Sequence, residues 1–159
     1  MSEEKRNLKR EDYIIEHLDG ELKETALKFA DYLNENQITL KPDGSPDGKI
    51  PYKEYYLCEI RIEPNKLEFH FWFGDYSGEF DEGFTSAVQK HIRFCRACHS
   101  PCTGGMDTII FGKEFENVCS QHTVVFENPD EKELQYIKTL IEYAKKIVPD
   151  SVSYHAHNL

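Results

Sequence analysis

The fold is decided by residues 55–73, where the chain reads YYLCEIRIEPNKLEFHFWF. In the second half of this segment apolar and polar side chains alternate, which is the period of a strand with one buried face. The Pro-Asn pair before it is typical of a turn. The segment therefore predicts an antiparallel hairpin with strands over 55–62 and 67–73 and a turn at 63–66.

One face of this hairpin is apolar and belongs to the core. Its predicted members are Cys58, Ile60, Ile62, Leu67, Phe69, Phe71 and Phe73. The opposite face of the second strand carries Glu68, His70 and Trp72. Glu68, two residues from His70 on the same side, suggests general acid–base chemistry, whereas the simpler role for His70 is a surface pair with the neighbouring strand. His70 with Trp72 suggests a ligand groove on the sheet.

Helical spacing of apolar residues recurs on both sides of the hairpin. It predicts a turn and a helix between Tyr13 and Leu33, with the break near Gly20. A second helix starts at Phe84 and its apolar stripe extends to Cys95, so this helix is expected to deliver Cys95. A third helix starts at Asn128-Pro-Asp and ends before Pro149, with either Asn128 or Asp130 as its start signal.

The remaining segments complete an α+β pattern. Two Pro-Asp-Gly-type turns make residues 41–49 a loop, and runs over 107–111 and 118–126 predict a second hairpin. The order α-β-β-α-β-β-α then indicates a single antiparallel sheet of about four to five strands with three helices. We expect a flexible N-terminal segment at 1–12, one domain at 13–150 and a tail at 151–159.

Composition limits the function. The 159 residues include 19 Lys and Arg against 29 Asp and Glu, a net charge of −10, which argues against nucleic acid as a partner. No long apolar run is present, so a membrane span is not expected. The charged N-terminus shows no secretory signal, and we expect a cytoplasmic protein.

Three of the five cysteines fall in the stretch FCRACHSPCTGG at 94–105. Cys95, Cys98 and Cys102, joined by the later Cys119, form the spacing of a four-thiolate site. Thiols stay reduced in the cytoplasm, so such a group points to a metal or to catalysis before disulfides. Four thiolates leave no open position on the ion. The sequence thus predicts a structural zinc site, with Gly104 and Gly105 letting the chain turn.

Other interpretations of the same cysteines stay open. The string Cys95-Arg-Ala-Cys98-His99 is that of covalent haem attachment, but no signal or haem pocket accompanies it. Four thiolates could instead hold an iron-sulfur cluster. Cys95 and Cys98 could form a redox switch or supply a reactive thiolate. A metalloenzyme would have three cysteine ligands and an open fourth position, with His99 or Cys119 as the variable partner.

The two motifs FCxxCxxPCxGG at 94–105 and IFGKEFxNVC at 110–119 resemble an uncharacterised family of small bacterial proteins of clostridia-like anaerobes. The resemblance covers roughly residues 90–130. It implies a shared cysteine site and a bacterial cytosolic origin, and it implies no activity.

The sequence alone therefore favours a cytosolic metal-binding module that holds a structural zinc ion and has a small molecule or a protein as its partner. Nothing in it points to a specific reaction. The alternative is a thiol-based redox sensor or a thiol-dependent enzyme that uses Cys95 or Cys98.

Overall fold

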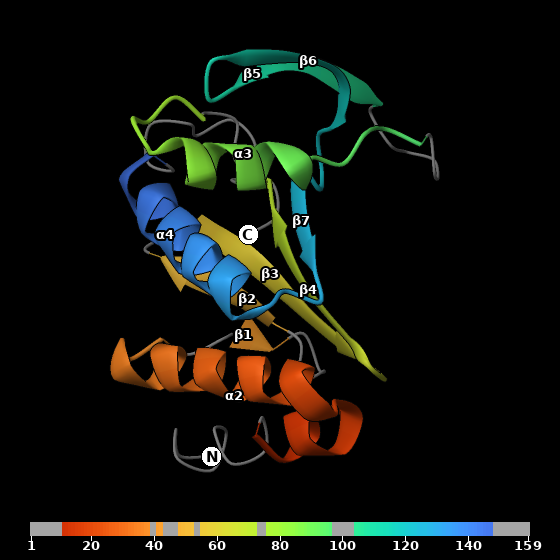
Figure 1. The fold of residues 1–159 in the computed structure, drawn as a ribbon, viewed down its shortest axis with the longest axis vertical. Coiled ribbons are helices and arrows are strands. Elements are labelled where there is room, and N and C mark those ends of the chain that lie inside the picture. The colour runs from red at the N-terminus through yellow and green to blue at the C-terminus, as the bar shows by residue number, and fades with distance from the viewer. Residues whose placement is uncertain are drawn as a thin grey trace.

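The hairpin predicted at 55–73 forms the centre of a five-stranded antiparallel sheet in the computed structural model, in the order β1-β2-β3-β4-β7 (Figure 1). The structure describes residues 11–38, 41–42, 48–52, 55–72, 76–96 and 104–147. The strands of this sheet are β1 (Lys41–Pro42), β2 (Gly48–Tyr52), β3 (Tyr55–Glu63), β4 (Lys66–Phe71) and β7 (Val124–Glu127). The turn between β3 and β4 contains Asn65 at a φ of 56°, so the predicted hairpin is confirmed.

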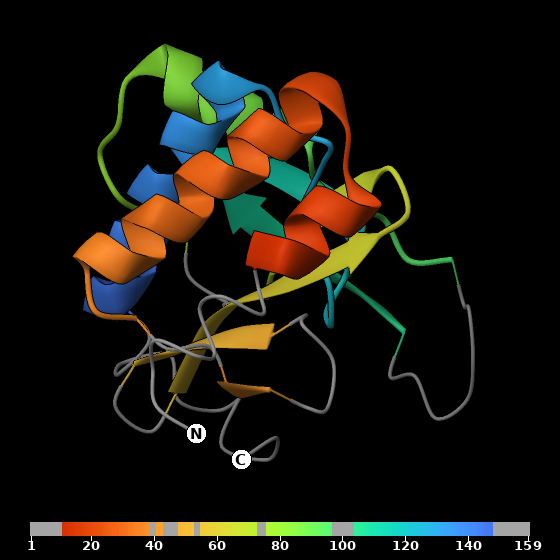
Figure 2. The same ribbon diagram turned by 90° about the horizontal axis from the view of Figure 1, so that it is seen from below.

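Helices cover one face of this sheet (Figure 2). They are α2 (Gly20–Glu35), α3 (Glu82–Lys90) and α4 (Glu131–Ile147), and residues 11–17 are also helical. Gly20 has a φ of 57°, which explains the predicted break between the first two helical segments. The Asp130 carboxylate accepts a 2.8 Å hydrogen bond from the amide of Glu133 and caps α4, which decides between the two predicted start signals.

The core lies between the sheet and the helices. Phe69 of β4 is fully buried, and its ring meets Phe29 of α2 edge to face at 4.8 Å between centroids. The other described residues predicted for this face are also buried, namely Cys58, Ile60, Ile62, Leu67 and Phe71. Each such aliphatic or aromatic side chain contributes about 1.5–3 kcal/mol by leaving water.

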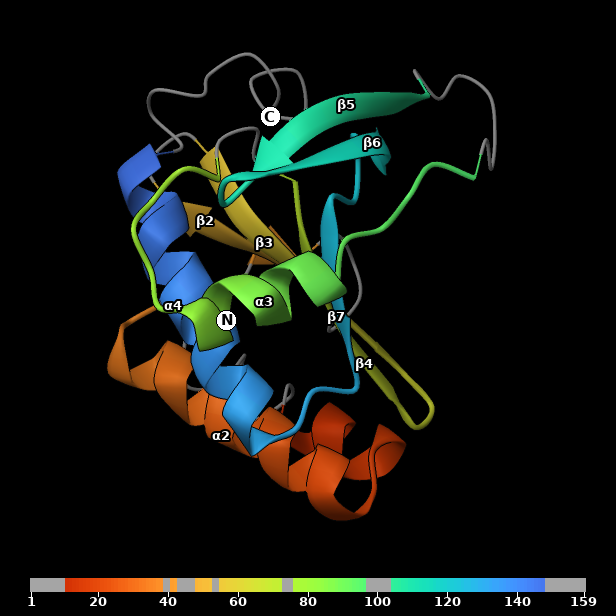
Figure 3. The same cartoon turned by 45° about the horizontal axis from the view of Figure 1, so that its top comes forward.

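A second, two-stranded sheet is formed by β5 (Gly105–Ile110) and β6 (Lys113–Cys119). It lies at the end of the molecule beyond α3 (Figure 3). Phe111 and Gly112 link the strands with φ angles of 48° and 81°, as a tight hairpin turn requires. Ile110 is fully buried, and the amide of Phe111 donates to the carbonyl of Tyr76 at 2.7 Å. Ile110 thus attaches this hairpin to the main core.

The α+β class is confirmed, but the predicted count and pairing of elements are wrong. The described residues hold four helices and two sheets, where three helices and one sheet were expected. The predicted strand 118–126 is divided by a bend at 120–123, because its last residues pair with β4 and its first with β5. β2 begins at Gly48, inside the segment expected to be a loop.

The expected domain limits can be compared with the structure at one end only. Within the predicted flexible segment 1–12, residues 11 and 12 are helical. The rest of that segment and the predicted tail at 151–159 lie outside the described residues. No helix in the described ranges is both long and apolar enough to cross a bilayer.

The prediction that a helix delivers Cys95 is wrong, because α3 ends at Lys90. The amides of Arg93 and Cys95 donate instead to the carbonyls of Thr123 and Asn117, at 3.0 and 2.7 Å. Residues 92–95 are therefore extended. Alternating β-branched and aromatic residues, Ile92 and Phe94, suit an extended segment as well as they suit a helical stripe.

Two neighbouring isoleucines test the attachment of the second sheet. Ile110 is fully buried, whereas Ile109 is 57% exposed. We expect Ile110→Ala to lower the free energy of unfolding by about 2–5 kcal/mol, because it leaves a cavity. Ile109→Ala should change it by less than about 0.5 kcal/mol. Urea titration measures both, and equal effects would contradict the described packing.

Candidate functional site

The face of the large sheet that lies away from the helices carries polar side chains, and we call it the second face. Glu68 and His70 of β4 lie on it and are only 6% and 0% exposed. The register places Arg61 of β3 opposite Glu68, and Glu59 opposite His70. Buried polar groups of this kind require hydrogen-bond partners.

Glu68 has two such partners. Nζ of Lys66 donates to one carboxylate oxygen at 2.6 Å, and Nε2 of His70 contacts the other at 2.5 Å. Burial raises the pKa of Glu68, but the hydrogen bonds from Lys66 and His70 outweigh it, so the pKa lies below its ordinary value. Glu68 is therefore a carboxylate in the folded protein.

The second ring nitrogen of His70 reaches His122. The two Nδ1 atoms are 3.0 Å apart, and the rings meet edge to face. Burial, followed by the positive charge of Arg61, lowers the pKa of His70 to about 4 and also lowers the pKa of His122. Glu68, His70 and His122 thus form a hydrogen-bonded chain of one carboxylate and two neutral imidazoles, which we call the relay.

The relay changes two expectations from the sequence. The expected cross-strand surface pair is wrong, because His70 is fully buried and its partners are Glu68 of its own strand and His122. The expected ligand groove involved His70 and Trp72. His70 is fully buried and Trp72 is only 9% exposed, so these two side chains offer little surface to a ligand. The half-buried His122 is the exposed end of the cluster.

His122 was not among the predicted site residues. It lies in the bend between β6 and β7, 52 residues from His70 along the chain. No local spacing connects the two histidines. Only the pairing of β7 with β4 brings them together, and a single sequence does not reveal that pairing.

The extended segment that follows His91, the C-cap of α3, lies beside both β7 and β6. Ile92 pairs with Val124, and Phe94 pairs with Val118. Ile92, Val124 and Val118 are buried in the core. Because side chains alternate along a strand, Arg93 and Cys95 face away from the core. Cys119, the residue after Val118, faces the same way.

Cys95 and Cys119 are therefore on one side of the same ladder. The amide of Cys95 donates to Asn117 at 2.7 Å, and the amide of Cys119 donates to Arg93 at 2.8 Å. Each cysteine is thus the diagonal neighbour of the other, at a typical Cα separation of about 7–8 Å. Both side chains are half-buried.

The predicted four-cysteine knuckle is not shown as a whole, because Cys98 and Cys102 lie outside the described residues. Among the residues that the structure describes, no three His, Cys, Asp or Glu side chains are grouped as a metal site. Cys58 is buried in the core, as predicted, and burial raises its pKa. It is consequently a poor nucleophile.

The glycines after the third cysteine have the predicted role of turning the chain. Gly104 has a φ of 86°. A side chain on Gly105 would lie 2.9 Å from the backbone of Asn117, which is too close for any residue but glycine. Gly105 also pairs with Cys119 in the β5–β6 ladder. The chain therefore returns to Cys119 directly after the cysteine-rich stretch.

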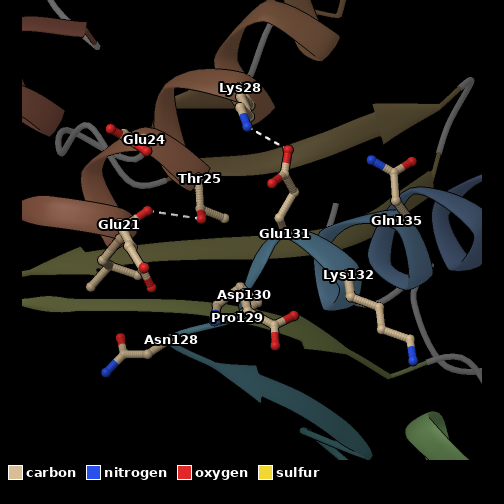
Figure 4. Close-up of a pocket in the computed structure, with 11 residues that line it drawn as sticks. Glu21, Glu24, Thr25, Lys28, Asn128, Pro129, Asp130, Glu131, Lys132 and Gln135 are labelled. Atoms are coloured by element: carbon tan, nitrogen blue, oxygen red, sulfur yellow. Dashed lines mark hydrogen bonds and ion pairs between the residues drawn. The ribbon is translucent and has the colours of Figure 1, made fainter.

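A polar cleft of about 1020 Å³ lies between α2 and the start of α4 (Figure 4). Lys28 contacts Glu131 across it, and both side chains are at least half exposed. The buried Thr25 hydroxyl is already used, since it donates to the carbonyl of Glu21 at 2.9 Å. Charges of both signs line the cleft, so it has no marked preference for one class of ligand.

Comparison of the chain with known protein families, with curated proteins and with solved structures found no match. The chemistry of its own residues is therefore the basis for a function.

The buried relay predicts how stability depends on pH. The pKa of His70 is about 4 in the folded protein and about 6.5 when the chain is unfolded, so between these values the unfolded state binds more protons. The contribution of His70 to the free energy of unfolding should be fully present above pH 6.5. The free energy of unfolding should then fall by roughly 2–3 kcal/mol as the pH drops to 4.

Urea unfolding at a series of pH values measures this dependence, and His70→Gln isolates it. The variant should lose most of the slope between pH 6.5 and 4, whatever its absolute stability. His17→Gln removes a histidine outside the relay and should keep the slope. A wild-type protein with the same slope as His70→Gln would contradict the buried, neutral His70.

Proposed function

We propose that the protein is a metal-binding module in which Cys95, Cys98, Cys102 and Cys119 hold a structural zinc ion. The observation that carries this proposal is the placement of Cys95 and Cys119 as diagonal neighbours on one side of a ladder. Both side chains are half-buried, as expected of ligands at the edge of a fold.

The spacing of this pair suits a bridging metal better than a disulfide. A disulfide requires Cα atoms about 4.4–6.8 Å apart, whereas diagonal neighbours lie about 7–8 Å apart. Two thiolates, each about 2.3 Å from a shared zinc ion, span the larger separation.

The connectivity favours the same site. Cys98 and Cys102 lie between Cys95 and Gly105 in the sequence. The amide of Cys95 donates to the carbonyl of Asn117, and Gly105 pairs with Cys119. The described residues on both sides of Cys98 and Cys102 are therefore held next to the Cys95–Cys119 pair. Four thiolates would close the coordination sphere, so the ion would stabilise the second sheet and would not bind substrate.

In this proposal the zinc ion joins the strand 92–95 to β6 and supports the adjacent second face, where a small molecule or a protein would bind. A reducing compartment such as the cytoplasm would keep the thiols available. The competing proposal is a thiol-based redox sensor or enzyme. It is favoured by the positive charge of Arg93, which lies directly across the ladder from Cys119.

Elemental analysis of the full chain, purified without oxygen or chelator, tests the zinc proposal. We expect about one zinc ion per chain and no visible absorbance. Cys95→Ser and Cys119→Ser should lose the ion and lower the melting temperature, because metal binding contributes folding free energy. Cys58→Ala is the matched control, since its thiol is in the core. It should lower stability but retain the zinc.

Three results would contradict the zinc site. Iron with visible absorbance would make it an electron-transfer centre. Zinc retained in Cys119→Ser would exclude that ligand. A metal-free protein whose Cys95 alkylates rapidly at neutral pH would favour the thiol-based function.

A further inference from the structure

The hydrogen-bond chain through the relay runs in one direction. Glu68 is a carboxylate and accepts only, so Nε2 of His70 carries the proton that it donates. Nδ1 of a neutral His70 is then a lone pair, and Nδ1 of His122 must donate to it. Nε2 of His122 is left as an unprotonated nitrogen.

That nitrogen is the open end of the relay. His122 is half-buried, and no other described group hydrogen-bonds to it. The Glu68 carboxylate, acting through His70, thus fixes the tautomer of the half-exposed His122. Hydrogen bonds of this kind to a carboxylate also orient histidines that ligate metals. His122 presents an acceptor to whatever binds there.

The charges around His122 come from three strands. Arg61 of β3 is neutralised by Glu59 through a 3.0 Å ion pair, and Glu68 of β4 is paired within the relay. Arg93, on the extended segment 92–95, faces the same side and is near enough for its charge to act on His122. No described carboxylate pairs with Arg93, so its positive charge is available.

We propose that His122 and Arg93 bind a small oxyacid that carries both a negative charge and a proton, such as a phosphate or a hydroxy acid. Arg93 would contact the negative oxygen, and Nε2 of His122 would accept the hydrogen bond of the O–H group. This site uses none of the four proposed zinc ligands.

The acceptor at His122 implies selectivity. Inorganic phosphate keeps an O–H group near neutral pH, whereas sulfate has only acceptor oxygens. The lone pair on Nε2 of His122 and a sulfate oxygen would repel each other, so the wild-type site should prefer phosphate.

Glu68→Gln should reverse the direction of the relay. Lys66 would continue to donate to the oxygen at its side, which turns the amide nitrogen of Gln toward His70. That amide would donate to Nε2 of His70, Nδ1 of His70 would donate to His122, and Nε2 of His122 would become a donor. The preference for phosphate over sulfate should then be lost or reversed.

Nitrogen-15 NMR of the full chain tests the proposal in two measurements. The first assigns the histidine tautomers. In the wild type we expect the proton of His122 on Nδ1 and that of His70 on Nε2, and both should exchange places in Glu68→Gln. A wild-type His122 protonated on Nε2 would overturn the proposal.

The second measurement titrates inorganic phosphate and sulfate at pH 6.5 and follows the side-chain signals of His122 and Arg93. We expect saturable binding of phosphate, at least tenfold tighter than that of sulfate. Arg93→Gln should weaken phosphate binding at least tenfold, whereas Lys113→Gln, which removes an exposed charge in the β5–β6 hairpin, should not change it.

Equal binding of the two anions by the wild type, or an Arg93→Gln variant that binds phosphate normally, would overturn the proposal. Should Glu68→Gln fail to fold, the wild-type selectivity and Arg93→Gln decide it alone. Zinc content does not enter either readout, so the failure of one proposal is distinguishable from the failure of the other.

Discussion

The structure depends on the antiparallel pairing of residues 91–95 with two successive strands. Val125 and Cys119 donate to the carbonyls of His91 and Arg93, at 3.0 and 2.8 Å, so one short segment joins β7 to β6. The residues between those strands must then leave the ladder as a bend, and this bend carries His122 onto His70. The same pairing places Cys95 beside Cys119. Both proposed sites follow from this one set of backbone hydrogen bonds.

β4 is buried on both faces, and the buried polar residues on its second face fix the register of the strand. An apolar strand could slide in register at little cost, but Glu68 and His70 are buried and must keep their partners. Lys66 neutralises the carboxylate from the rim, and the carboxylate in turn fixes the proton of His70. A face that exists only to pack against the rest of the chain would not need a tautomer fixed at its exposed end. This cost in buried polar groups supports a binding role for His122.

Local patterns in the sequence were sufficient for the β3–β4 hairpin, the cap of α4 and the buried Cys58, because each depends on period or turn chemistry within a few residues. They were insufficient after Lys90, where Ile92 and Phe94 satisfy a helical stripe and a strand equally well. Only distant partners decide between the two, and those partners, Val124 and Val118, are 32 and 24 residues further along the chain. His122 was missed for the same reason, since its contact with His70 spans 52 residues.

Amide hydrogen exchange of residues 93–95 tests the central pairing most directly. A strand paired as described hydrogen-bonds the amides of Arg93 and Cys95 but leaves the amide of Phe94 to solvent. We predict slow exchange at Arg93 and Cys95 and fast exchange at Phe94. Similar protection of all three amides, as in a helix that continues from α3 through Cys95, would contradict the pairing and with it both proposed sites.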